Sequence, residues 1–191
     1  MPISPSHTRI AVVGASSTRV GAAIALAVTV AACATSRPSA PAPFAQATLR
    51  STTGAEVGTA TFRQVDGAIR VDVDVRGVAD GAHGLHIHTV GRCDPPAFAS
   101  AGGHLNPDGH KHGTKNPAGP HAGDLPNVII NGGRSSGYTA MTLRVTNDAG
   151  PAGLFDADGA AIVLHADADD DMTDPAGNAG ARIACGVIQK L

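Results

Sequence analysis

The chain is poor in aromatic side chains and in net charge. Its 191 residues include no Trp, one Tyr and four Phe, so a large aromatic core is excluded. The 14 basic and 16 acidic residues give a formal charge of −2, which excludes the basic surface typical of nucleic-acid binding. Gly and Pro are abundant, at 24 and 13. This composition favours aliphatic strands and many turns over a helical bundle.

Long apolar runs are scarce as well. The longest, Val20–Ala32, is too short to span a bilayer but suits the core of a signal peptide, and the residues before it include Arg but no acid. We therefore predict a signal peptide over residues 1–32. The small residues before Cys33 resemble a bacterial lipobox, which would make Cys33 the lipidated first residue of the mature chain. A plain signal peptide cut near Ala32-Cys33-Ala34 is the alternative. Either interpretation predicts export to the periplasm or cell envelope, and the first predicts a membrane anchor.

Three cysteines are present, Cys33, Cys93 and Cys185. If Cys33 carries lipid or leaves with the leader, the other two remain as a pair. An oxidising compartment would allow a Cys93–Cys185 disulfide. The alternative is two buried free thiols.

Residues 33–43 are rich in Ala, Ser and Pro and predict a tether, followed by one domain over residues 44–191. Ile69–Arg76 alternates apolar and charged residues, the pattern of a half-buried strand. Asp66-Gly67 before it is a hairpin signal. Together the strand candidates number eight: Ala47–Ser51, Gly58–Val65, Ile69–Arg76, Gly84–His88, Asn127–Ile130, Tyr138–Val145, Ala161–His165 and Ala181–Ile188. No stretch of the mature chain has a helical period, so we predict an antiparallel sandwich or barrel.

Two long polar segments, Gly91–Leu125 and Ala166–Gly180, interrupt these strands. Loops of this length are usually functional or disordered. The first holds four of the nine histidines, which favours a function.

His86 and His88 stand two apart in a predicted strand, so their side chains share one face. Leu85 and Ile87 take the core face. His104, His112, His121 and Asp124 follow in the first long loop, and His165 ends a later strand. Imidazole suits copper and zinc, and a carboxylate can complete a zinc site. Seven ligands fill two four-coordinate sites if one histidine is shared. Taken singly, each histidine could be an ordinary solvated side chain, and the loop could be a loose zinc buffer.

The joint pattern resembles the copper–zinc superoxide dismutases, and in particular their bacterial branch. The resemblance extends from about Ala47 to Ile188 and rests on six separated motifs: Gly84–His88 (GLHIH), Ser100–Pro107 (SAGGHLNP), Lys111–Gly113 (KHG), Gly119–Asn127 (GPHAGDLPN), Val163–Asp170 (VLHADADD) and Gly177–Ile188 (GNAGARIACGVI). It implies an eight-stranded, immunoglobulin-like Greek-key barrel with two long functional loops.

The resemblance also implies a role for each site residue. Copper would be bound by His86, His88, His104 and His165, and zinc by His104, His112, His121 and Asp124. His104 would bridge the two ions and carry a proton. Asp169 would link a copper histidine to a zinc histidine, Arg182 would hold the anion beside copper, and Cys93 and Cys185 match the family's disulfide.

Several alternatives stay open. His110 could compete with His112 for zinc, although the Lys-His-Gly context favours His112. Asp169 could be a solvated acid and Arg182 a surface charge. His83 resembles a structural histidine and is not counted as a ligand.

The activity implied is disproportionation of superoxide to oxygen and hydrogen peroxide. The alternative is a periplasmic copper- and zinc-binding protein of the same fold without turnover. Monomer and homodimer are both compatible with these motifs. The second long loop is acidic and lacks Lys, so the sequence leaves open how a negative substrate is attracted.

Overall fold

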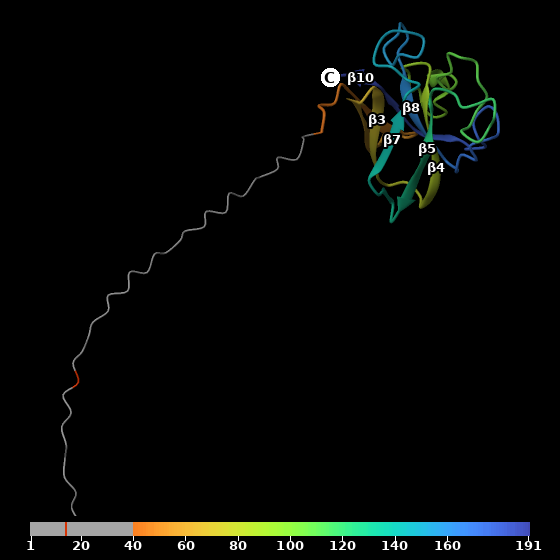
Figure 1. Ribbon diagram of the computed structural model, residues 1–191. Coiled ribbons are helices and arrows are strands. Elements are labelled where there is room, and N and C mark those ends of the chain that lie inside the picture. The colour runs from red at the N-terminus through yellow and green to blue at the C-terminus, as the bar shows by residue number, and fades with distance from the viewer. Residues whose placement is uncertain (1–13, 15–39) are drawn as a thin grey trace, which may run out of the picture. The chain divides into compact units, whose positions relative to one another are not determined.

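The computed structural model describes Gly14 and residues 40–191. Residues 45–190 form one ten-stranded antiparallel sheet that curls into a barrel (Figure 1). The strands are β1 (Ala45–Ser51), β2 (Glu56–Val65), β3 (Ala68–Val75), β4 (Gly81–His88), β5 (Asp124–Asn131), β6 (Arg134–Ser135), β7 (Tyr138–Thr142), β8 (Ala161–His165), β9 (Arg182–Val187) and β10 (Gln189–Lys190).

The strand order is β6-β5-β4-β8-β9-β1-β2-β3-β7, with β10 beside β1. Chain segments distant in sequence, such as β4 and β8, are therefore neighbours, which is the Greek-key arrangement. The barrel nearly closes where Arg134 bridges Arg76 beyond β3 and Val75 N donates to Ser135 Oγ at 2.9 Å. The predicted all-β fold is confirmed. The eight predicted strands correspond to the eight observed strands of five or more residues. The two-residue strands β6 and β10 were not predicted.

The β2–β3 hairpin shows how the local sequence sets the register. Asp66 and Gly67 both have positive φ, 47° and 84°, as a type I′ turn requires. Val65 and Ala68 therefore pair, and the ladder continues to Gly58 opposite Val75. The alternating residues of β3 then place Val71, Val73 and Val75 in the core.

Strand β4 departs from the alternation seen in β3. It begins at Gly81, before the predicted start at Gly84, and residues His83 to His88 are all buried. Leu85 and Ile87 join the barrel core, whereas His86 and His88 lie on the opposite, outer face. That face is buried because the two long loops cover it.

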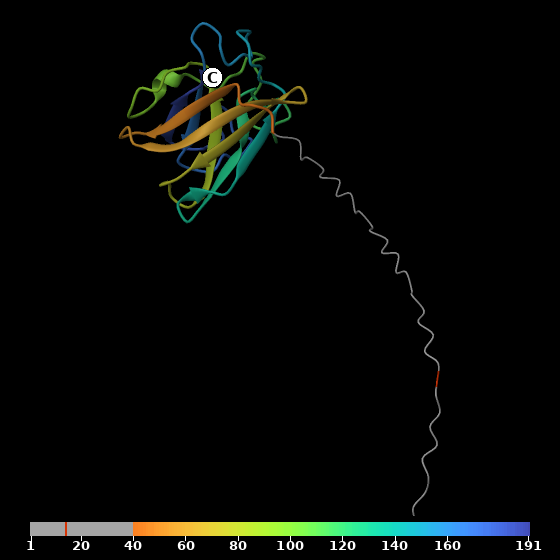
Figure 2. The same ribbon diagram turned by 90° about the vertical axis from the view of Figure 1, so that its left-hand side faces the viewer.

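The loops connect β4 to β5 and β8 to β9, as predicted. In Figure 1 both lie on the same side of the barrel. The first contains a single turn of 3-10 helix, Ala99–Ala101, visible as a short coil in Figure 2. Across residues 40–191 no helix is long and apolar enough to cross a membrane. Apart from Gly14, the predicted leader lies outside the described residues, as do Cys33 and most of the tether.

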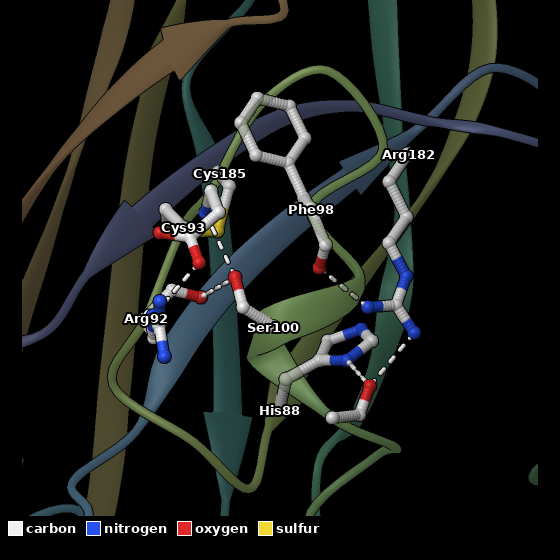
Figure 3. The surroundings of a disulfide bond; sticks show 9 residues. His88, Arg92, Cys93, Phe98, Ser100, Arg182 and Cys185 are labelled. Atoms are coloured by element: carbon white, nitrogen blue, oxygen red, sulfur yellow. Dashed lines mark hydrogen bonds and ion pairs between the residues drawn. A yellow bond between two sulfur atoms is a disulfide. The ribbon is translucent and has the colours of Figure 1, made fainter.

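A disulfide joins Cys93 of the first long loop to Cys185 of β9, 92 residues apart (Figure 3). The predicted pairing is confirmed. Cys185 is buried among Phe98, Ala101 and Val163, so the bond fastens the start of the loop to the barrel wall.

Removing this bond should destabilise the domain. For Cys93→Ala/Cys185→Ala we expect the free energy of unfolding of the metal-free domain to fall by about 3–5 kcal/mol, because the unfolded chain loses a long-range constraint. Denaturant titration measures this. Reductant should lower the stability of the wild type and leave the double variant unchanged. Equal stability of the oxidised wild type and the variant would contradict the prediction.

Candidate metal centre

Four histidines converge on the outer face of β4. His86 and His88 come from β4 itself, His165 ends the neighbouring strand β8, and His104 of the first loop pairs with His88 through an isolated bridge. One ring nitrogen of each lies within 4.8 Å of the others. All four side chains are buried, His86 and His88 completely.

Each of these rings leaves one nitrogen without a hydrogen-bond partner among the described residues: His86 Nδ1, His88 Nε2, His104 Nε2 and His165 Nε2. Buried polar atoms rarely stay unpaired. The opposite nitrogen of three rings donates to a fixed acceptor: His86 Nε2 to Asp169 Oδ2 at 2.7 Å, His88 Nδ1 to Gly102 O at 3.0 Å and His165 Nδ1 to Gly180 O at 3.2 Å. These bonds fix the tautomer and leave the free nitrogens as lone-pair donors for a metal.

A second set contains His104, His112, His121 and Asp124. Asp124 Oδ1 lies 2.8 Å from His104 Nδ1, 3.1 Å from His112 Nδ1 and 3.2 Å from His121 Nδ1. Ligands about 2 Å from a tetrahedral zinc ion stand about 3.3 Å apart. Although His112 Nδ1 is close to Asp124, it makes no hydrogen bond among the described residues. The spacing and the donor types fit zinc.

Asp124 is held so that one oxygen faces the histidines. Its Oδ2 accepts from the backbone of Gly113 at 2.9 Å and of His121 at 3.0 Å. The position of Asp124 along the chain follows from the sheet, because it begins β5 opposite His86 of β4.

His104 belongs to both sets. Its unpartnered Nε2 faces the first set, and its Nδ1 lies beside Asp124 in the second. The His86 and His104 ring centroids are 4.0 Å apart, so the two sets adjoin.

Asp169 of the second loop joins the sets behind the rings. It accepts from His86 Nε2 at 2.7 Å and from His112 Nε2 at 2.9 Å. The neighbouring backbone must pass close to it at Gly177, where φ is +60° and a Cβ would overlap Asp169 Oδ1. Glycine is therefore required for both reasons.

Arg182 begins β9 and is fixed by the disulfide-bonded loop. Its two Nη atoms donate to Phe98 O and Gly102 O, each at 2.7 Å (Figure 3). It lines a pocket of about 520 Å³ together with His104 and His165. Gly102 O also accepts from His88 Nδ1, so one carbonyl positions both Arg182 and a ring of the first set.

Two further histidines of residues 40–191, His83 and His110, lie outside the two sets. His110 donates from Nδ1 to Pro120 O at 3.1 Å, and His112 takes the place in the second set. His83 is bonded to His165 O and Ala79 O.

Burial determines the charge state of the first set. It lowers the pKa of His88 to about 2, of His86 to about 3 and of His165 to about 4, so these rings are neutral and able to bind metal at physiological pH. Burial also lowers the pKa of His112, but Asp124 and Asp169 outweigh it and raise that pKa to about 10. Burial opposes ionisation of Asp169, yet the bonds from His112 and His86 hold its pKa well below the usual range.

The fold and the site define a class: an antiparallel β-barrel with two adjoining clusters of four side chains that could each hold a metal ion and that share His104. Comparison with known proteins agrees. The family model described as copper/zinc superoxide dismutase (SODC) matches residues 56–188. Superoxide dismutase [Cu-Zn] 2 of Aquifex aeolicus is 42% identical over 147 residues, 76% of this chain and 86% of that protein. Superoxide dismutase [Cu-Zn] of Deinococcus radiodurans is 40% identical, over 78% and 86%.

Structural comparison gives the same result. The crystal structure of a SOD-like protein from Bacillus subtilis has a TM-score of 0.70 and 34% identity, covering 74% of this chain and 95% of that one. The chain belongs to the copper/zinc superoxide dismutase family.

The buried histidines make the stability of the metal-free domain depend on pH. Because the folded-state pKa values of His86, His88 and His165 lie below 6.5, the unfolded chain binds more protons between pH 6.5 and about 4. Stability should therefore fall as the pH falls through this window, by about 1.4 kcal/mol per pH unit for each ring.

Denaturant titrations of the metal-free domain between pH 7 and 4.5 measure this slope. His165→Gln, which cannot titrate, should have a shallower slope by about one proton. An equal slope in the variant would contradict the assignment of that ring to the effect.

Proposed function

We propose that this protein disproportionates superoxide, with copper bound by His86, His88, His104 and His165 and zinc by His104, His112, His121 and Asp124. The observation that carries the proposal is the placement of His104, which offers Nε2 to one set and Nδ1 to the other beside the Arg182 pocket. The chemistry of the donors matches these ions.

When bound, copper supplies one-electron redox chemistry, so that two superoxide ions and two protons become one oxygen and one hydrogen peroxide molecule. The side chains supply binding and protons. Arg182 attracts the anion into the pocket by charge and hydrogen bonds. His104 Nε2 can take up a proton and release it to the reduced substrate. Asp169 and Gly102 O keep the other rings in the orientation and tautomer that leave a lone pair for the metal.

The acidic second loop does not oppose the substrate as strongly as its composition suggests. Asp174 pairs with Lys111 at 2.9 Å and Asp171 with Lys115 at 3.3 Å, so two of the loop's acids are partly neutralised. Since these lysines are partly neutralised too, we assign the attraction at the pocket to Arg182 and the bound cations.

We further propose export and anchoring through lipidated Cys33, in the periplasm or cell envelope. The support is the apolar run before Cys33 and the Cys93–Cys185 disulfide, because such bonds persist in oxidising compartments.

The dismutase activity can be measured by pulse radiolysis of the copper- and zinc-loaded domain. We expect rapid, catalytic superoxide decay, and loss of at least 100-fold in His86→Ala/His88→Ala because two copper ligands are gone. Arg182→Ala should retain both metals and lose about tenfold in rate, together with most of its salt dependence. Wild-type decay no faster than that of the ligand variant would favour the metal-binding protein without turnover.

The anchor has a separate test. Labelled palmitate should enter the full-length protein in a bacterial host, and the protein should sediment with membranes. Cys33→Ser should abolish both, because the thiol is the site of acylation, whereas Cys93→Ser should keep the label. Label that persists in Cys33→Ser would exclude lipidation at this residue.

A further inference from the structure

The two long loops are joined along a seam between residues 111–116 and 169–174. Lys115 N donates to Asp171 O at 3.0 Å, and Asn116 Nδ2 donates to Met172 O at 3.1 Å. At Gly113 the backbones approach so closely that a Cβ would overlap Asp171 C. The second loop thus covers the set of His104, His112, His121 and Asp124 and shields it from solvent.

Asp174 occupies one end of this seam, beside two histidines of that set. Its Oδ1 accepts from the backbone N of His112 at 2.9 Å and lies 3.9 Å from His121 Nε2. Its Oδ2 accepts from Lys111 Nζ at 2.9 Å. None of these contacts involves a ring nitrogen that faces Asp124. Asp174 therefore contacts the second set from its outer side and is not one of its four members.

We infer that Asp174 is a positioning residue for zinc: it holds His112 and the covering loop in place and so slows the release of the ion. The inference rests on the zinc site proposed above. The second loop contributes no ligand to that set, and Asp169 and Asp174 are the two of its side chains that bond to His112.

The contacts of Asp174 are expected to differ in how strongly they hold His112 and the covering loop in place. The pair with Lys111 is exposed on both sides, and such pairs contribute little. The bond to His112 N is charge-assisted, and the residue that it holds is completely buried. A buried amide that loses its acceptor must find another or move. The bond to His112 should therefore carry most of the effect.

The test is the rate of zinc transfer from the copper- and zinc-loaded mature domain to a chromogenic chelator in excess. Asp174→Ala should release zinc at least tenfold faster than the wild type. Asp174→Asn should stay within about threefold, because its amide oxygen can still accept from His112 N. Lys111→Met should also stay within threefold. Asp94→Ala is the matched control. Asp94 is an exposed acid of the first loop whose side chain pairs with Arg92 at 2.7 Å and, within residues 40–191, bonds to no member of either set.

Copper release, measured in parallel, should be unchanged in every variant. Asp174→Ala releasing zinc at the Asp94→Ala rate would overturn the inference. Copper and zinc released faster by the same factor would also overturn it, because Asp174 would then be a general brace of the loop. A wild-type domain that binds no zinc, or an unchanged zinc content in His112→Ala, would instead reject the zinc site itself and the inference with it.

Discussion

Burial of imidazoles on the outer face of β4 is the constraint on which the rest of the structure depends. A strand on a barrel wall ordinarily presents one face to the core and one to water, but His86 and His88 are completely buried on the side that faces away from the core. The two long loops cover these rings. The buried ring nitrogens in turn require hydrogen-bond partners. Asp169, Gly102 O and Gly180 O provide them on one side of each ring, which leaves the other nitrogen for a metal.

The disulfide extends this arrangement to the substrate pocket. Cys93 fastens the first loop to β9, the loop carbonyls of Phe98 and Gly102 hold Arg182, and Gly102 O also holds His88 (Figure 3). The short segment Phe98–Gly102 therefore sets the distance between His88, a ring of the first set, and the Arg182 guanidinium that would attract the anion. Preorganisation of this kind lets charge act without reorganisation during the reaction.

Much of the fold was predictable because its signals are local. The alternation in β3 and the Asp66-Gly67 turn specify a hairpin and its register. Strand β4 was harder. Residues His83 to His88 are buried on both faces, so alternation cannot mark them, and the strand's first residues, the exposed Gly81 and half-buried Ala82, are too small to form an alternating pattern. The two-residue strands β6 and β10 carry too little sequence to be recognised, and they exist through pairing with β5 and β1.

The sequence by itself determined the chemistry available: His86 and His88 on one strand face, His104, His112 and His121 in one loop with Asp124 close behind, His165 at a strand end, and a single pair of cysteines in the predicted domain over residues 44–191. The tertiary structure decided the geometry. It placed His112 rather than His110 among the rings of the second set, turned His104 so that its two nitrogens face different sets, and paired Lys111 and Lys115 with the acids of the second loop. The lysine–acid pairs join segments more than 50 residues apart, and the placement of His104 and His112 depends on ring orientation. Residue spacing along a chain specifies neither.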